Sequence, residues 1–254
     1  MACRLRSAAA AILAAVALLS HLATAAKLPA SFKRCKAGDP QLGGCMKEAI
    51  KVAVGELAKG APSLGVLPID PLAISALSIG RGSGPVDVSL DFKDLTIHGL
   101  SSAVIETASF DTKTLSLDMQ TRFPGPVSLL GQYRIDGKVL VLPITGEGRC
   151  NLTFADLTTT AKIRAEKVVK DGQTYGRVLS FGFSLQPQRL HMDFENLFNG
   201  DKALGDNMNK FLNENWQEIL KELQPAVEEA FGATFKEIVN RIYQRVPYKD
   251  LLLE

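Results

Sequence analysis

Residues Asp201–Val246 read DKALGDNMNKFLNENWQEILKELQPAVEEAFGATFKEIVNRIYQRV. Their apolar side chains recur every three or four residues, which is typical of an amphipathic α-helix. These side chains are Leu204, Met208, Phe211, Leu212, Trp216, Ile219, Leu220, Leu223, Val227, Phe231, Phe235, Ile238 and Ile242. A helix of this length is on the order of 65 Å long at 1.5 Å per residue. No other helical segment of the sequence is long enough to cover its apolar stripe, so we expect a sheet to do so.

Two residues within this segment disfavour a straight helix. Pro225 lacks a backbone N–H and predicts a kink, and Gly232 is less favourable than alanine by about 1 kcal/mol. The sequence leaves two outcomes open, a single bent helix or two helices that meet at Pro225.

The region between residue 70 and this helix alternates apolar and polar residues with period two, as strands do. Val86–Phe92 keeps its apolar residues on one face, whereas Leu95 and Ile97 follow the opposite parity, so we expect a bulge near Lys93-Asp94. Further alternating runs are Leu115–Met119, Ile163–Ala165, Phe181–Leu185 and Leu190–Phe194.

Two stretches carry hairpin signals, Asp136-Gly137 and the looser Asp171–Gly176. Strands joined in this way are antiparallel. The predicted fold class is therefore α+β, with a long C-terminal helix wrapped by a highly curved antiparallel sheet.

The first 26 residues are typical of a secretory signal peptide. Arg4 and Arg6 provide a basic start, Ala8–Leu19 is apolar, and Ala23–Ala25 offers small residues for cleavage. The apolar run is too short to span a bilayer, so the mature chain is predicted to be secreted and extracellular, without stable membrane insertion.

Residues 27–254 are predicted to form one domain, because no repeat or low-complexity tract divides them. Near its start, Cys45–Lys59 has the apolar spacing of a short helix that ends at Gly60-Ala61-Pro62. The apolar stripe of this helix requires a surface to pack on.

Three cysteines remain after cleavage. Cys35 and Cys45 flank a loop rich in turn formers, and in an oxidising compartment we expect them to form a structural disulfide bond rather than a redox site. Cys150 precedes the glycosylation acceptor Asn151-Leu152-Thr153. Strand alternation places Cys150 on the inner face and Asn151 on the outer face, which favours a buried thiol over an intermolecular disulfide.

The charge of the mature chain excludes several partners. Removal of Arg4 and Arg6 leaves 27 basic residues against 27 acidic ones. A near-neutral chain without a basic patch predicts no nucleic acid and no anionic membrane as the partner.

No residue pattern indicates catalysis. The mature histidines, His98 and His191, both occupy the polar side of a strand, and the sequence around Ser101 lacks the second glycine of a nucleophile elbow. The glycine-rich stretch Gly80–Pro85 lacks the lysine and the following helix of a phosphate loop. The cysteine and histidine spacing fits no metal site. We therefore predict no catalytic residues, no metal and no cofactor.

A single helix and one curved sheet enclose more length than their side chains fill, because many inward strand positions are small. We expect a residual elongated apolar cavity that binds a lipid-like ligand. Its predicted lining residues are Phe92, Phe181, Phe183, Phe211, Trp216 and Phe235.

Several segments resemble the arthropod takeout and juvenile-hormone-binding proteins. They are the Cys35 and Cys45 pair, DFENLFNGD at Asp193–Asp201, Asn213–Trp216 and Val246–Tyr248. The resemblance spans the mature chain and implies a secreted carrier of small hydrophobic ligands with the tubular lipid-binding fold, found in haemolymph or a similar fluid. Hormone-binding members have a second disulfide bond, whereas Cys150 has no mature partner, which favours the takeout branch.

The leading hypothesis is a monomeric, non-catalytic carrier that sequesters a terpenoid such as juvenile hormone, or a fatty acid, in an internal apolar tunnel. The alternative is a secreted signalling protein, linked to circadian or feeding control, that acts through a receptor. A third hypothesis is a secreted esterase that uses Ser101.

Overall fold

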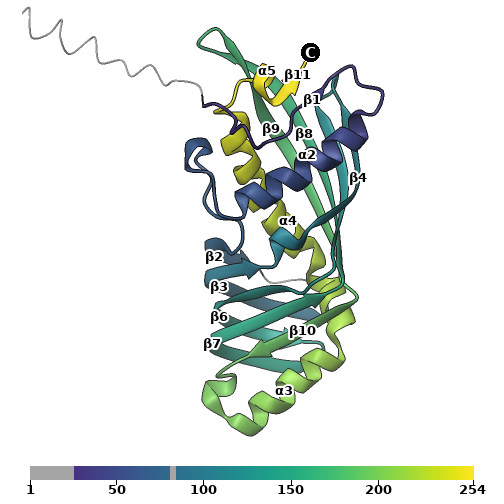
Figure 1. Cartoon of the computed structure of the whole chain (residues 1–254). Helices are drawn as coiled ribbons and strands as arrows, with labels where there is room; N and C mark the ends of the chain where they lie inside the picture. The colour runs from purple at the N-terminus through teal and green to yellow at the C-terminus, as the bar shows by residue number, and fades with distance from the viewer. Residues whose placement is uncertain (1–25, 81–83) are drawn as a thin grey trace, which may run out of the picture.

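The structure, a computed structural model, describes residues 26–80 and 84–254. The molecule is elongated, with one antiparallel sheet in its lower half, a second in its upper half, and the C-terminal helices alongside both (Figure 1). Residues 1–25 and 81–83 lie outside the described part of the chain, so neither the signal-peptide prediction nor most of the Gly80–Pro85 loop is tested.

The two halves are built from separate sheets rather than from one. The lower sheet has the order β10-β7-β6-β3-β2 and the upper one β4-β5-β8-β9. The lower strands are β2 (Leu72–Ile79), β3 (Val86–His98), β6 (Val127–Val139), β7 (Leu142–Ala155) and β10 (Arg189–Phe194). The upper strands are β4 (Val104–Asp111), β5 (Ser116–Phe123), β8 (Leu157–Lys170) and β9 (Gln173–Gln186). The α+β class with curved antiparallel sheets is confirmed, but the single sheet was wrong.

The short elements cluster near the chain ends. β1 (Cys35–Lys36) pairs in parallel with β11 (Leu252–Leu253), and α2 (Leu42–Leu57) packs against β4. α5 (Tyr248–Leu251) precedes β11. The single-turn 3-10 helices are η1 (Pro62–Leu64), η2 (Leu100–Ser102) and η3 (Phe198–Gly200).

One predicted irregularity is confirmed and one predicted turn is wrong. The register of β3 against β6 shifts between Lys93 and Thr96, as the parity change indicated. Asp136-Gly137 lies inside β6, and the β6–β7 turn is at residues 140–141 instead. Gly137 is needed for close approach, because a Cβ there would lie 2.8 Å from the Cα of Val88 on β3. Asp171-Gly172 does form the β8–β9 turn.

The C-terminal helical segment is two helices, and their junction differs from the sequence-based expectation. α3 spans Lys202–Glu214 and α4 spans Trp216–Tyr243, with the break at Asn215. The Asn215 side chain donates a hydrogen bond to the carbonyl of Phe211 at 2.8 Å, which holds this junction. α4 continues through the exposed Pro225, so a break at that residue was wrong.

α3 covers the exposed edge of the lower sheet with amide side chains. Asn213 accepts a hydrogen bond from the Met192 N–H at 2.9 Å and donates one to the Met192 carbonyl at 2.6 Å. Asn209, one turn earlier, makes the same pair of bonds to Phe194 at 3.0 and 2.9 Å. Because β10 is an edge strand, these bonds satisfy backbone groups that no neighbouring strand reaches.

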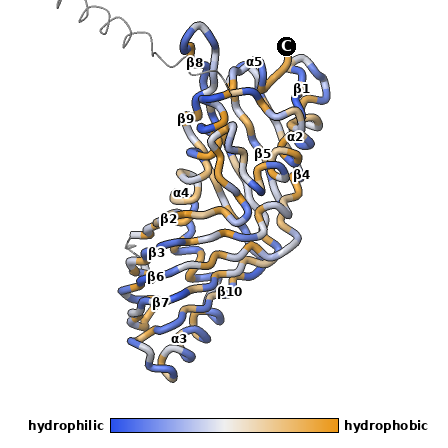
Figure 2. Tube along the Cα trace, turned by 60° about the vertical axis from the view of Figure 1, so that its left-hand side comes forward, coloured by the Kyte–Doolittle hydropathy of each residue, from blue (hydrophilic) through white to orange (hydrophobic). Residues whose placement is uncertain are grey.

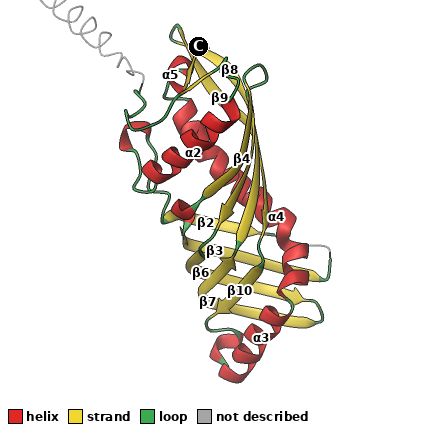
Figure 3. Ribbon diagram, turned by 45° about the vertical axis from the view of Figure 1, so that its right-hand side comes forward, coloured by secondary structure: helices red, strands yellow, loops and turns green. Residues whose placement is uncertain are grey.

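α4 covers the edge strand of the upper sheet in a similar way (Figure 3). Glu228 accepts a hydrogen bond from the Leu185 N–H and Gln224 donates one to the Leu185 carbonyl, both at 3.0 Å. The buried Asn240 accepts one from the Val178 N–H at 2.8 Å. Glu228 is therefore half-buried against the sheet edge.

Replacing Asn213 with alanine is expected to lower the free energy of unfolding by about 2 kcal/mol, because both backbone groups of Met192 lose their partner. Urea unfolding measures the change. Asn207→Ala is the control, since Asn207 is on the same helix and exposed. Equal midpoints for the two variants would show that α3 does not stabilise the edge of β10.

The cysteines occupy the positions that the sequence indicated. Cys35 and Cys45 are bonded, which ties β1 to α2, and Cys150 is a buried free thiol. Burial raises the pKa of the Cys150 thiol to about 11, so it stays protonated at neutral pH. Asn151 is exposed on the opposite face of β7.

Candidate functional site: an internal apolar cavity

The upper half of the molecule contains a cavity of about 400 Å³ that is partly open to solvent. Its walls are the inner face of the β4-β5-β8-β9 sheet, the C-terminal half of α4, α2 and the segment before β1. The volume lies within the range of roughly 300–1,000 Å³ that is usual for small-molecule sites. By proportion to a cavity of about 150 Å³ that holds benzene, it accommodates on the order of 15 non-hydrogen atoms.

The strands line this cavity because their side chains alternate between two faces. Along β5 the residues Leu117, Met119 and Thr121 face the cavity, and Asp118 faces outward. Figure 2 shows the same alternation of hydrophobic and hydrophilic residues along the strands of the lower sheet. An amphipathic strand thus provides an apolar inner wall and a polar outer surface.

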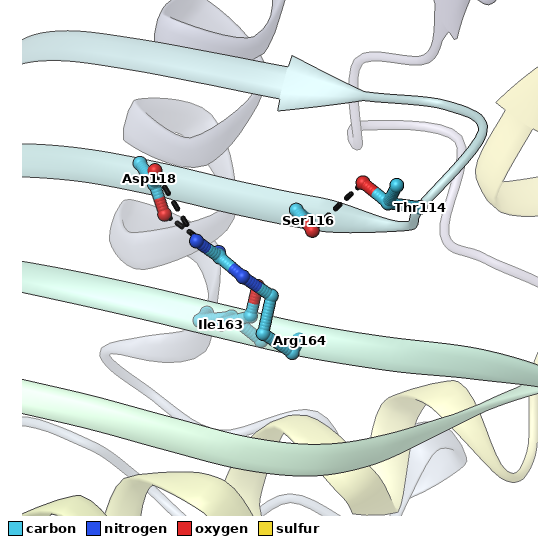
Figure 4. A network of polar contacts seen from close by, with 5 residues as sticks. All are labelled: Thr114, Ser116, Asp118, Ile163 and Arg164. Carbon is cyan, nitrogen blue, oxygen red and sulfur yellow. Dashed lines mark hydrogen bonds and ion pairs between the residues drawn. The ribbon is translucent and has the colours of Figure 1, made fainter.

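Salt bridges reinforce the outer face of the cavity wall (Figure 4). The Arg164 Nη1 atom on β8 lies 2.6 Å from Asp118 Oδ1 on β5, and the hydrogen bond from Arg164 lowers the pKa of Asp118. Thr114 donates a hydrogen bond to Ser116 at the β4–β5 turn, at 2.8 Å. These groups are solvent-exposed, so they contribute little to stability, and their charges lie on the side of the sheet that faces away from the cavity.

α2 covers the cavity with the apolar stripe that the sequence predicted. The predicted positions Met46, Ile50, Val54 and Leu57 all line the cavity, and so do Ala49 and Ala53. Only Leu57 among them is fully buried, because the other side chains face the cavity rather than a filled core. The helix therefore packs against β4, and its apolar stripe faces the cavity.

A second, smaller cavity of about 80 Å³ lies between the inner face of the lower sheet and the C-terminal helices, and apolar residues line it. Leu129, Phe154 and Phe231 line both cavities. These three side chains therefore lie where the two cavities adjoin and form the partition between them.

The six residues predicted to line a ligand site lie in three different places. Phe181, Phe183 and Phe235 line the large cavity, and Phe92 lines the small one. Phe211 and Trp216 line neither and pack in the core of the lower half. Helical periodicity marks all apolar positions of a face alike, so it does not distinguish cavity lining from core packing.

Phe231 and Phe235 on α4 and Phe183 on β9 form an aromatic cluster at one wall of the large cavity. The ring centroids of Phe183 and Phe235 are 5.1 Å apart, and those of Phe231 and Phe235 are 6.1 Å apart. Gly232 allows α4 to approach β9 here, because a Cβ would lie 2.8 Å from the Phe181 carbonyl oxygen. The glycine that weakens the helix therefore serves close packing.

Few polar side chains line the large cavity. They are Lys33, Thr121, Thr159 and Tyr243. Burial, with a smaller contribution from Tyr248, raises the pKa of Tyr243, so its hydroxyl is neutral at physiological pH. Thr121 and Thr159 were not among the predicted lining residues. Each lies two residues from an inward-facing side chain, Met119 or Ala161, and this two-residue spacing was the signal that could have identified them.

The structure places Ser101 in a turn held by Asp70. The Ser101 hydroxyl donates a hydrogen bond to the Asp70 carboxylate, which also accepts the Ser101 N–H at 2.8 Å and the Gly99 N–H at 3.0 Å. Burial alone raises the pKa of Asp70, but these hydrogen bonds outweigh it and lower the pKa. His98 lies 3.1 Å from the hydroxyl of Thr96, and His191 is exposed. In residues 26–80 and 84–254 neither histidine hydrogen-bonds Ser101.

Two further observations bear on the site. Within the described ranges, His, Cys, Asp and Glu form no group of three or more that could hold a metal ion. Of the helices in that same part of the chain, none has the length and apolar character required to cross a membrane.

The sequence is similar to that of known proteins. The family model described as haemolymph juvenile hormone binding protein matches residues 11–253. The circadian clock-controlled protein daywake of Drosophila melanogaster is 28% identical over 229 residues, which cover 87% of each chain. A putative beta-carotene-binding protein of Schistocerca gregaria is 24% identical over 216 residues, 85% of each chain.

The crystal structure of Epiphyas postvittana Takeout 1 has a TM-score of 0.77 to this structure at 24% sequence identity. The match covers 87% of this chain and 100% of Takeout 1. The two chains therefore share the fold of two curved antiparallel sheets with a long C-terminal helical segment.

Proposed function

Because this chain belongs to the haemolymph juvenile hormone binding protein family, a family of ligand-binding carriers, we propose that it is a non-catalytic carrier of one small hydrophobic molecule in its large cavity. The observation that carries this proposal is the apolar cavity of about 400 Å³ between α2, α4 and the upper sheet. An unfilled apolar space of this size is unfavourable for packing. A bound lipid removes that penalty.

The cavity volume selects the size of the ligand. Room for on the order of 15 non-hydrogen atoms suits a sesquiterpenoid or a fatty acid of medium length. The much longer skeleton of beta-carotene, which the name of the Schistocerca gregaria relative mentions, exceeds this space. A ligand that buries about 300 Å² of apolar surface gains roughly 7 kcal/mol before the costs of association.

Export belongs to the same proposal. A disulfide bond between Cys35 and Cys45 is typical of extracellular proteins, and Asn151 is exposed as a glycosylated asparagine must be. We propose cleavage of residues 1–26 and release of a monomer into haemolymph or a similar fluid. N-terminal sequencing of the exported protein tests the cleavage site. A mature chain that does not begin at residue 27 would contradict the proposed cleavage.

Filling the cavity is expected to abolish ligand binding. Ala53 lines the cavity from α2, and Ala53→Phe inserts a ring into the space that a ligand occupies. We expect at least a tenfold loss of affinity and no ligand-induced rise in Tm, where the parent protein gains about 2.7 kcal/mol at a ligand concentration of 100 Kd. Ala76→Phe on the exposed face of β2 is the matched control and should keep both properties.

Native mass spectrometry of gently purified protein tests the proposal without an assumed ligand. The expected result is a bound species with the mass of a small lipid, which disappears in the Ala53→Phe variant. A protein that is empty in every preparation, and whose Tm no member of a lipid panel raises, would overturn the carrier function.

The second candidate is a signalling protein that acts through a receptor. It is favoured by one observation, the name of the daywake relative, which describes that protein as controlled by the circadian clock. The Ala53→Phe variant separates the two candidates. Partner binding that survives the filled cavity would favour signalling without a ligand.

A further inference from the structure

Two threonines stand out in the wall of the large cavity. Thr121 on β5 is 5% exposed and Thr159 on β8 is 8% exposed, and both line the cavity. They are direct cross-strand partners, which places their side chains next to each other on the inner face of the sheet. Their neighbours in the same row, Ile105 and Leu185, are apolar and buried.

Neither hydroxyl has a hydrogen-bond partner among residues 26–80 and 84–254. Asn240, also buried and polar, accepts a hydrogen bond from the Val178 N–H at 2.8 Å. By contrast, no protein group in the described ranges forms a hydrogen bond with the side chain of Thr121 or Thr159. Their oxygens are also not among the side-chain atoms fully enclosed by protein. The small accessible area of each oxygen therefore faces the cavity.

This pair of hydroxyls lies toward the inner end of the cavity, which continues past it to residues of the lower sheet such as Leu129. The next row of the sheet is Phe123 paired with Leu157. Leu157 follows closely on Phe154, one of the three side chains that separate the two cavities. Lys33, the charged residue in the lining, precedes β1, which lies at the far end of the molecule from the lower sheet (Figure 1). The threonine pair and Lys33 thus lie toward opposite ends of the space.

The two hydroxyls and the apolar side chains around them determine which ligand group can bind there. A threonine hydroxyl both donates and accepts hydrogen bonds, so the pair can bind an ester, ketone, epoxide or alcohol oxygen. A carboxylate at this end would be buried beside apolar side chains without a cation, which is strongly unfavourable. A hydrocarbon would leave both hydroxyls without partners.

We propose that Thr121 and Thr159 bind a neutral oxygen at the leading end of the ligand, whose apolar chain extends along the cavity toward α2 and Lys33. This inference rests on the proposed carrier function. It narrows the ligand class to neutral oxygenated lipids, such as esters, ketones or alcohols, in preference to hydrocarbons and ionised fatty acids.

The test compares methyl tetradecanoate, tetradecanoic acid and pentadecane as ligands of the mature protein, by displacement of a fluorescent lipid. The parent protein should bind the ester most tightly. Thr121→Val and Thr159→Val keep the shape of the side chain, and each should weaken ester binding by about 3- to 10-fold while leaving pentadecane binding unchanged. Thr121→Ser and Thr159→Ser should keep the preference for the ester.

The controls are Thr158→Val and Thr160→Val on the outer face of β8, which should change none of the affinities. Equal losses for ester and hydrocarbon in the inner variants would assign the threonines a packing role and overturn the inference. A parent protein that prefers the acid, with that preference removed by Lys33→Ala, would overturn it in favour of an anionic ligand oriented from the other end.

The outcomes also separate this inference from the carrier function. Equal binding of ester and hydrocarbon by the parent protein overturns the role of the threonines and leaves the carrier function in place. Binding of none of the three ligands, with an unchanged Tm, overturns both.

Discussion

Phe231→Ala is expected to lower the free energy of unfolding by about 3–5 kcal/mol and to join the two internal cavities. Phe231 is 6% exposed and contacts the ring of Phe183, so its removal loses apolar burial and leaves a void that the sheets on either side cannot close. Together with Leu129 and Phe154 it separates the small cavity from the large one.

Joining the two cavities should change the ligand chain length that the protein binds most tightly. We expect affinity along a series of saturated alcohols to peak at a longer chain in Phe231→Ala than in the parent protein, since each additional buried methylene contributes about 0.8 kcal/mol. Urea unfolding measures the first effect, and displacement of a fluorescent lipid measures the second.

Phe235→Ala is the matched control for the role of the partition. Phe235 contacts Phe231 but lines only the large cavity, so its removal should widen that cavity without joining it to the small one. We expect Phe235→Ala to bind bulkier ligands than the parent protein does, with the same preferred chain length. An identical length preference in the parent protein and Phe231→Ala would show that the partition does not limit the ligand.

Replacing both Cys35 and Cys45 with serine is expected to lower the free energy of unfolding by about 3 kcal/mol on the chain-entropy estimate for a loop of this size. The bond links β1, which pairs with β11 at the C-terminus, to the first turns of α2. α2 buries few side chains completely, so this covalent link is a large part of what holds it over the cavity.

Hydrogen exchange shows which part of the molecule loses stability when the disulfide bond is removed. Amide protons of α2 should exchange markedly faster in the Cys35→Ser/Cys45→Ser variant, whereas those of the lower sheet should change only with global stability. Reduction of the parent protein is the control and should reproduce the effect, because Cys150 takes part in no disulfide bond. Unchanged exchange of α2 after reduction would mean that packing alone holds this helix.

The sequence predicted correctly those features that depend on local periodicity and spacing. The apolar stripe of α2, the bulge of β3 and the opposite exposure of Cys150 and Asn151 all follow from the 3.6-residue or two-residue period. The resemblance of the C-terminal segment to the takeout proteins indicated the family, which the family model confirms.

Two local signals were misleading, and for the first of them a tertiary contact is the reason. Asp136-Gly137 has the composition of a turn, yet β6 needs a glycine there to admit the backbone of β3. Pro225 has the composition of a helix break, yet α4 tolerates it on the exposed side, and the junction falls at Asn215 instead. Asn209 and Asn213 likewise gave no signal of their role at the edge of β10.

The sequence by itself determined that a long amphipathic helical segment packs against curved strands and that a disulfide bond ties down the N-terminal helix, because both depend on residues close together in the chain. Only the tertiary structure decided where the enclosed space is divided and where it is polar. Phe154 and Phe231 meet from distant segments, and Thr121 faces Thr159 only in one register of β5 against β8. Such alignments are set by how strands and helices pack across the whole molecule, and no local pattern encodes them.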